Sequence, residues 1–270
     1  MLDTSAPNLA RAYDYLLGGG ANFAADRALA GRVLSACPSA GELLSVSRTY
    51  AADSLTHIAS QGGVDQYLDV GSGLPTRPST HEVVRALRPN ARVVYADRDP
   101  GVVAHATALV PRPVRVIEAD LAEPEALLAA LPGLVDLSRP LCVILTMVLQ
   151  VLDPPAARAV VGVLVRALPP GSYLVLSVGA GESGRLPDAV APGGFTADDV
   201  MSFLGGLDLV PPGIRQGEVL CGTGVKPARH GPRAAGTERP VTPAGAGGPR
   251  RRPRSSAPDH RPGRPSPPLV

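Results

Sequence analysis

The 270-residue chain contains no tryptophan, only 3% aromatic residues and three cysteines. Without large rings, the core must be built from aliphatic side chains, which supply most of the 44% hydrophobic content. Cys37, Cys142 and Cys221 are far apart in sequence and form no CxxC pair. Neither a zinc site nor a disulfide framework is therefore expected, and Cys142, inside an apolar run, is predicted to lie in the core.

Long apolar runs and a targeting segment are also missing. The longest apolar run, residues 141–149, is too short to cross a bilayer. The N-terminal residues lack the basic segment followed by an apolar stretch that is typical of a signal peptide. We therefore expect no membrane association and a reduced, cytoplasmic setting.

Charge is divided unevenly along the chain. Residues 1–225 contain 16 basic and 22 acidic residues, whereas residues 226–270 contain 10 basic and 2 acidic ones. The acidic excess gives no reason to expect nucleic-acid binding by the folded part. Residues 226–270 are rich in Pro, Arg, Gly and Ser and show no apolar periodicity. They are predicted to be a disordered basic tail.

Apolar periodicity predicts a helical beginning and an α/β remainder. Helical spacing covers residues 8–18, 22–36 and 40–60, with Asn22 as the expected cap of the second helix. Strands are expected at residues 64–70, 91–97, 113–120, 141–149 and 172–178, with a helix after each of the first four. A helix at 196–204 and a hairpin from 207–212 and 217–225 follow. We expect a helical cap over 1–63 and a mainly parallel sheet over 64–225.

A glycine loop follows the first predicted strand, in the segment Asp69-Val70-Gly71-Ser72-Gly73. Ligands of doubly wound sheets bind at the carboxyl ends of the strands. A dinucleotide site would have a third glycine where this chain has Thr76. The carboxylate of Asp69 would repel a pyrophosphate, but it suits an ammonium group such as that of S-adenosylmethionine (SAM). The alternative for this loop is a purely structural turn.

Acidic or polar residues also end the next three strands. Asp97 is placed to accept hydrogen bonds from two ribose hydroxyls; the alternative is that it caps the following helix, a role that Asp99 can also fill. Asp120 is placed to accept a bond from an adenine amino group, or else is a turn residue. Thr146 and Gln150 follow the fourth strand, where Gln150 either orients an acceptor or serves as a polar cap.

These segments resemble the bacterial S-adenosyl methyltransferase family, formerly a domain of unknown function. The resemblance covers residues 6–178 and parts of 195–213. Its most specific segments are 12–19 (AYDYLLGG), 22–27 (NFAADR), 68–76 (LDVGSGLPT), 93–100 (VVYADRDP) and 170–177 (PGSYLVLS). The resemblance implies a class I Rossmann-like fold with helices on both faces of the sheet and SAM as the methyl donor.

The resemblance also implies two groups of site residues. The cofactor-binding residues are expected to be Asp69, Gly71, Ser72, Gly73, Asp97, Arg98, Asp120 and Leu121. The substrate side is expected to include Tyr13, Asp14, Tyr15, Asn22, Thr146 and Gln150. For Tyr13 and Asn22, helix packing and capping are the alternative roles. No catalytic base and no metal site are predicted.

The chain departs from the family pattern on the acceptor side. The family usually has His where this chain has Gln150, the segment between Gly179 and Phe195 is short, and the match ends near Gly213. These departures predict an incomplete C-terminal hairpin. The leading hypothesis is a SAM-dependent methyltransferase acting on an unidentified small-molecule acceptor. The alternatives are a degenerate SAM-binding protein without transfer activity and a nicotinamide-dependent oxidoreductase, which Asp69 and the missing third glycine disfavour.

Overall fold

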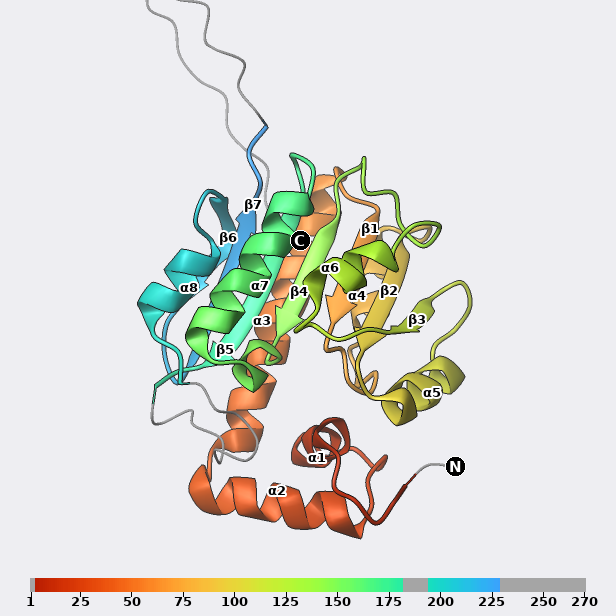
Figure 1. The fold of residues 1–270 in the computed structure, drawn as a ribbon, viewed down its shortest axis with the longest axis vertical. Coiled ribbons are helices and arrows are strands. Elements are labelled where there is room, and N and C mark those ends of the chain that lie inside the picture. Colours follow the sequence, from red (N-terminus) through yellow and green to blue (C-terminus); the bar gives the residue numbers. More distant parts are fainter. Residues whose placement is uncertain (1–2, 182–193, 229–270) are drawn as a thin grey trace, which may run out of the picture. The chain divides into compact units, whose positions relative to one another are not determined.

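The structure is a computed structural model, and it describes residues 3–181 and 194–228 (Figure 1). Within these ranges, seven strands form one sheet in the order β3-β2-β1-β4-β5-β7-β6. Five strands are parallel, and the last two add an antiparallel hairpin at one edge. The strands are β1 (Gln66–Val70), β2 (Arg92–Asp97), β3 (Arg115–Glu118), β4 (Cys142–Thr146), β5 (Tyr173–Gly179), β6 (Asp208–Arg215) and β7 (Val219–Val225). The predicted mainly parallel α/β fold is confirmed.

Helices cover both faces of the sheet, as predicted. In the described ranges they are α1 (Leu9–Leu16), α2 (Ala24–Ala36), α3 (Ala40–Gln61), α4 (Thr80–Leu87), α5 (Pro100–Leu109), α6 (Pro124–Ala129), α7 (Pro154–Ala167) and α8 (Ala197–Phe203), with a 3₁₀ turn, η1, at Leu149–Val151. Helices α6, α7 and α8 lie over one face, and α3 and α4 lie over the other. No helix in the described part is both long enough and apolar enough to span a bilayer.

Strand alternation separates two hydrophobic cores. In β4, Cys142 and Ile144 point toward α3 and α4, whereas Val143 and Leu145 point toward α6, α7 and α8. Successive side chains of a strand point to opposite faces, so a strand buried on both sides reads as an uninterrupted apolar run. Cys142 is fully buried, as predicted.

The C-terminal hairpin is complete, so the prediction of an incomplete one is wrong. β7 pairs with β5 over seven residues, from Tyr173–Val225 to Gly179–Val219. β6 pairs with β7 and carries an irregularity between Leu209 and Ile214. The irregular register, together with the consecutive prolines Pro211 and Pro212, weakens the alternation that would have shown a full strand in the sequence. The short segment noted between Gly179 and Phe195 falls mostly on residues 182–193, outside the described ranges.

Two local predictions are also corrected. The fourth strand ends at Thr146 rather than residue 149, because Met147 has a φ of 53°, in the left-handed region that a strand cannot continue through. Asn22 does not cap α2, which begins after Phe23. The side-chain amide of Asn22 instead donates to the carbonyl of Gly19, 2.8 Å away.

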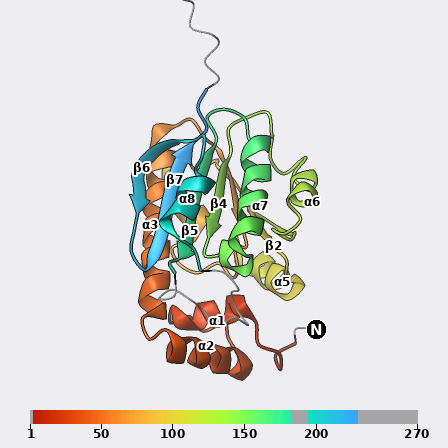
Figure 2. The same cartoon turned by 60° about the vertical axis from the view of Figure 1, so that its left-hand side comes forward.

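Helices α1 and α2 pack together at the end of the sheet where the parallel strands terminate (Figure 2). A buried ion pair joins Nε of Arg11 and Oδ2 of Asp26 at 2.7 Å. Asp26 also accepts hydrogen bonds from the backbone N–H groups of Asn8 and Phe23. The buried carboxylate of Asp26 is therefore paired and hydrogen-bonded, and its contacts hold α1 and α2 together.

Candidate functional site

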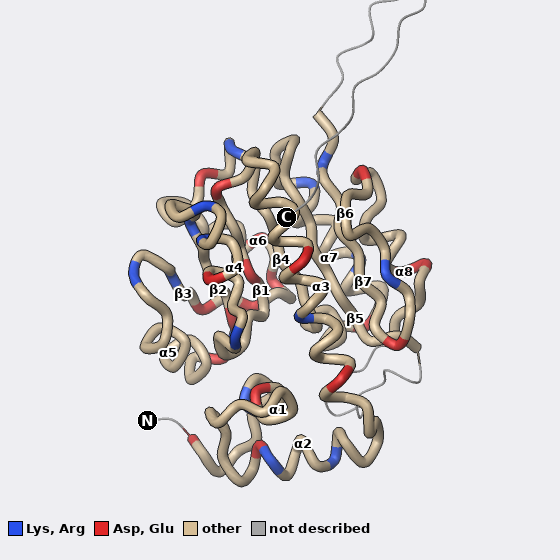
Figure 3. The backbone as a smooth tube through the Cα atoms, turned by 180° about the vertical axis from the view of Figure 1, so that it is seen from behind, with Lys and Arg blue, Asp and Glu red and all other residues tan. Residues whose placement is uncertain are grey.

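A cavity of about 440 Å³ lies between α1 and α3 and the carboxyl ends of the strands. This volume is in the range of small-molecule and cofactor sites. All eight predicted cofactor-binding residues line the cavity: Asp69, Gly71, Ser72, Gly73, Asp97, Arg98, Asp120 and Leu121. Figure 3 shows several acidic positions around the ends of β1 and β2 that face α1.

The glycine loop after β1 requires glycine for two reasons. Gly71 and Gly73 have φ values of 65° and 60°, a region that side chains other than glycine rarely adopt. A Cβ at Gly71 would lie 2.0 Å from Cγ2 of Val148. The loop is held down because the backbone N–H groups of Gly71 and Ser72 both donate to the carbonyl of Ala96 on β2. The strands therefore fix the shape of the loop.

Asp97 connects the end of β2 to this loop. Its Oδ2 accepts a hydrogen bond from the backbone N–H of Gly73 at 2.9 Å, and its Oδ1 accepts one from the N–H of Asp99. Asp99 is the N-cap of α5, accepting from the N–H of Val102. The capping alternative for Asp97 is therefore wrong, and its carboxylate lies on the cavity wall.

Asp69 lies deeper in the same cavity. It is 8% exposed, and its Oδ2 accepts a 2.6 Å hydrogen bond from the hydroxyl of Thr80 on α4. Burial raises the pKa of Asp69 to about 6, and the charge of Asp97 adds to the rise, whereas the Thr80 hydrogen bond and Arg48 oppose it. Burial likewise raises the pKa of Asp97. Because burial disfavours the charged forms of both carboxyl groups, a ligand with a cationic or hydroxyl group would stabilise them.

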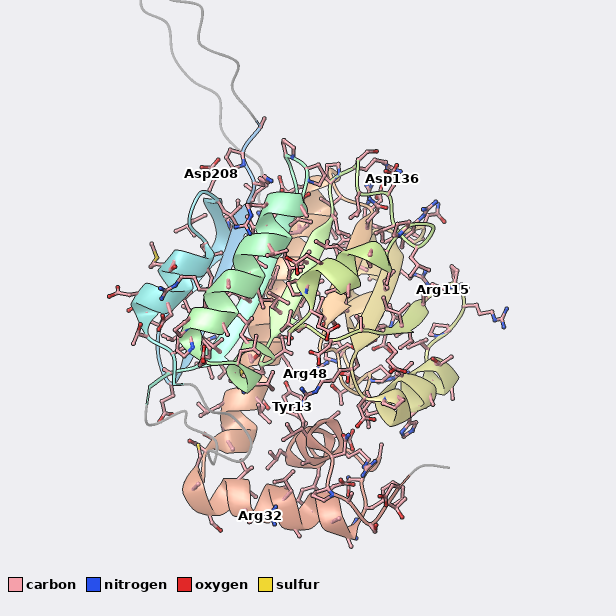
Figure 4. All side chains as sticks on the ribbon, viewed as in Figure 1. Tyr13, Arg32, Arg48, Arg115, Asp136 and Asp208 are labelled. Atoms are coloured by element: carbon pink, nitrogen blue, oxygen red, sulfur yellow. The ribbon has the colours of Figure 1, made fainter. Side chains whose placement is uncertain are left out.

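Arg48, which no sequence pattern marked as a site residue, is the main basic group of the cavity wall near Asp69. Its Nη2 donates to the carbonyls of Thr76 and Pro78 in the loop between β1 and α4. Its charge and a side-chain hydrogen bond lower the pKa of Tyr13 on α1, although burial has the larger effect and raises it. Figure 4 shows Tyr13 and Arg48 together between α1 and the strand ends. Helical spacing in 40–60 gave no sign that one position would reach the loop.

Three buried polar atoms on the described cavity wall have no hydrogen-bond partner: Nε of Arg48, Oγ of Ser72 and Oγ1 of Thr76. Buried polar groups in proteins are nearly always paired. Their clustering in one cavity marks the place where a polar ligand would satisfy them.

Asp120 and its neighbours form the far wall. Oδ1 of Asp120 accepts from the N–H of Ala122, which makes Asp120 a turn residue as well as a cavity residue. Arg98 is exposed and lies 3.9 Å from Oδ2 of Asp120. Leu121 is buried and gives this wall an apolar surface.

The profile of the S-adenosyl methyltransferase family matches residues 1–220. The chain belongs to this family. It is a SAM-dependent methyltransferase, and its acceptor is unidentified. The match extends past Gly213, where the resemblance in the sequence had ended, and so includes β6 and the first residues of β7.

Two solved structures resemble this methyltransferase over most of its length. A protein from Thermobifida fusca YX, provisionally assigned as a methyltransferase, is 33% identical, with 84% of this chain and 97% of that chain covered and a TM-score of 0.75. A DUF574 family protein from Streptomyces avermitilis MA-4680 is 28% identical, with 83% and 99% covered and a TM-score of 0.74. No curated protein matches the sequence.

Only some of the residues predicted for the substrate side of the methyltransferase line a cavity. Tyr13 and Thr146 line the main cavity, together with Met147. Tyr15 is exposed and lines neither this cavity nor the neighbouring one. Asp14 and Asn22 stabilise the turn after α1, where Asp14 accepts from the N–H of Ala21 and from the amide of Asn22.

Gln150 lines a second, apolar cavity that adjoins the first. The volume of this second cavity is about 90 Å³, and its wall shares Leu9, Tyr13, Met147 and Val151 with the main cavity. Oε1 of Gln150 accepts a long 3.4 Å hydrogen bond from the N–H of Gly179. Among the described residues, no group of three or more His, Cys, Asp or Glu side chains is placed to hold a metal ion.

Proposed function

We propose that this methyltransferase binds SAM in the 440 Å³ cavity, with the methionine part near Arg48 and Asp69 and the adenosine part near Asp97 and Asp120. The supporting observation is that three buried polar atoms without partners, the buried carboxylate of Asp69 and the half-buried carboxylate of Asp97 lie on one cavity wall. SAM carries an ammonium, a carboxylate, a ribose and an adenine, so it offers a complementary group to each.

Arg48 and Asp69 would hold opposite charges of the methionine part. The guanidinium of Arg48 has Nη2 engaged with backbone carbonyls, and its Nε is available to a carboxylate. Asp69 is a hydrogen-bond acceptor with one donor, Thr80, and its second oxygen suits an ammonium. Hydrogen bonds between charged groups contribute about 1.5–3 kcal/mol each. Together these two residues would fix the orientation of the cofactor.

The adenosine part would lie across the ends of β2 and β3. Asp97 already bonds the glycine loop, and a carboxylate has further acceptor sites for ribose hydroxyls. Asp120 would accept from the adenine amino group, while Leu121 packs on the ring and Arg98 covers it from solvent. Gly71, Ser72 and Gly73 allow the backbone to approach the ligand closely.

The acceptor would meet the methyl group near Tyr13, Thr146 and Met147. When bound, SAM supplies an electrophilic methyl group on a sulfonium, which is transferred by in-line displacement. The residues of this chain would position the two molecules and exclude water, and they need not form a covalent intermediate. Met147 holds a φ of 53°, and strained backbone of this kind gathers at ligand-binding positions.

We also propose a small-molecule acceptor and a reduced, cytoplasmic setting. The acidic groups around the cavity disfavour a polyanion such as nucleic acid. Cys142 and Cys221 are buried thiols, and burial raises the pKa of Cys221 to about 12, which keeps it unreactive.

A crystal structure with S-adenosylhomocysteine tests the proposed orientation. The expected result is an amino-acid end within hydrogen-bond distance of Arg48 and Asp69, and ribose hydroxyls on Asp97. A reversed ligand, with adenine against Arg48, would overturn the assignment of these residues while leaving the family membership intact.

A further inference from the structure

The 90 Å³ cavity beside the proposed cofactor site is the strongest remaining feature of the described chain. It lies between the helices α1 to α3 and the ends of β4, β5 and β7, and its wall includes Leu16, Val33, Leu44 and Val219. Because it shares Tyr13 and Met147 with the larger cavity, a molecule in it would reach the position proposed for the methyl group. This placement suits an acceptor.

Gln150 is the polar side chain buried in this apolar wall. It is 6% exposed, and its Oε1 accepts from the N–H of Gly179. That bond fixes the amide orientation, because a flipped amide would bring two N–H donors together. No hydrogen bond joins Nε2 of Gln150 to another described residue, so this donor is available to a molecule in the cavity. An amide N–H is a donor only, so its natural partner in a ligand is an acceptor oxygen.

The size and charge of the cavity restrict what can enter it. An apolar cavity of roughly 150 Å³ holds benzene, so 90 Å³ suits the compact aliphatic end of a molecule whose remainder extends into the main cavity. A charged group buried there would carry a large desolvation cost. Glu218 is a charged residue of the cavity wall; it is exposed to solvent at the rim, where it further disfavours an anion.

We infer that this cavity binds the methyl acceptor, and that the acceptor is an uncharged small molecule with a short aliphatic end and an oxygen that accepts a hydrogen bond from Nε2 of Gln150. This inference rests on the proposed SAM site, because the shared wall at Tyr13 and Met147 is what brings the two molecules together. It gives Gln150 a recognition role at a position where the resembling family usually has histidine.

Three shape-matched probes distinguish the ligand classes. Ligand-observed NMR on the full chain saturated with S-adenosylhomocysteine would compare 3-methylbutanamide, which is neutral, with 3-methylbutanoate and 3-methylbutylamine. The amide is expected to bind, with at least tenfold preference over both charged probes. Absence of amide binding, or tighter binding of either charged probe, would overturn the inference.

Matched variants test the role of each residue. Gln150→Leu removes the donor with little change in volume and is expected to weaken amide binding about 3- to 10-fold, the effect of one hydrogen bond. Glu218→Gln is expected to leave amide binding unchanged; a loss there would show that Glu218, rather than Gln150, holds the amide and would contradict the inference. Leu44→Phe, which fills the cavity, should abolish binding, whereas Leu34→Phe on the exposed face of α2 should not.

Calorimetry with S-adenosylhomocysteine on the same samples distinguishes failure of the proposed SAM site from failure of the proposed acceptor cavity. If the cofactor product does not bind wild type, the proposed function fails. If it binds wild type and Gln150→Leu equally but the amide does not discriminate between them, only the acceptor inference fails. Thermal melting of each variant identifies any that do not fold.

Discussion

The guanidinium of Arg48, in the middle of α3, donates a 2.6 Å hydrogen bond to the backbone carbonyl of Thr76, 28 residues further along the chain. Thr76 lies in the loop that follows Gly71 and Gly73, and its own hydroxyl is buried without a partner. The side chain of Arg48 therefore both anchors the loop after β1 and places a positive charge on the cavity wall. This contact connects the N-terminal helices to the binding chemistry.

Replacing Arg48 should weaken SAM binding. Arg48→Gln removes the charge that would face the methionine carboxylate, at a cost of about 1.5–3 kcal/mol, or roughly 10- to 100-fold in Kd. Calorimetry measures this directly. Arg32→Gln is the matched control, because Arg32 is an exposed arginine on α2, away from the cavity (Figure 4). Equal affinities for the two variants would remove Arg48 from the site.

The affinity for SAM should depend on pH through Asp69. The pKa of Asp69 is raised to about 6 in the ligand-free protein. As pH falls from 7 to 5, Asp69 takes up a proton that an incoming ammonium must displace. The Kd should therefore rise toward the low-pH end, approaching tenfold per pH unit. Titrations in the Asp69→Asn variant should give a weaker and much flatter profile over the same range, and an unchanged profile would assign the dependence to another group.

The same carboxyl should destabilise the ligand-free fold. Asp69 has an ordinary pKa of 3.8 when exposed in the unfolded chain, and a raised pKa when folded. Between these values the folded state binds the extra proton, so this contribution to stability falls as pH rises from about 4 to about 6 and stays lost above it. Asp69→Asn should raise the unfolding free energy at pH 7.5 by about 1–3 kcal/mol. Urea unfolding at pH 4.5 and 7.5 should show that the gain is largest at the higher pH.

Two truncations test where the basic tail, expected over residues 226–270, begins. A chain that ends at Ala228 should keep the wild-type Kd for SAM and the wild-type Tm, because the residues that line the cavity all lie before it. A chain that ends at Val225 should be less stable by about 1–2 kcal/mol. It loses Lys226, whose Nζ donates to the carbonyls of Val165 and Leu168 at the end of α7. Equal loss from both truncations would contradict a separate tail.

Local patterns in the sequence predicted most elements to within two or three residues. Strand ends and glycine loops are local features, so Asp69, Gly71 and Gly73 could be assigned to one edge of the sheet before the structure was known. Asp97 was predicted for the right edge with its role left open, and the structure excludes helix capping because Asp99 fills it.

Tertiary contacts account for what the sequence analysis missed. Arg48 contacts a loop 28 residues further along the chain, and the helical pattern of residues 40–60 does not indicate such a distant contact. The predicted fourth strand continued through apolar residues, but the backbone of Met147 turns it off the sheet. Tyr13 and Tyr15 are two residues apart in α1, so their side chains point to nearly opposite sides of the helix, and only Tyr13 lines the cavity.

The central claim is that SAM binds across the glycine loop and Asp97. Calorimetry with SAM and with NAD⁺ on wild type, Asp97→Ala and Asp208→Ala tests it most directly, since Asp208 is an exposed aspartate on β6 away from the cavity. The account predicts SAM binding to wild type and Asp208→Ala, at least tenfold weaker binding to a folded Asp97→Ala, and no heat with NAD⁺. Undiminished SAM binding by Asp97→Ala, or a preference for NAD⁺, would contradict it.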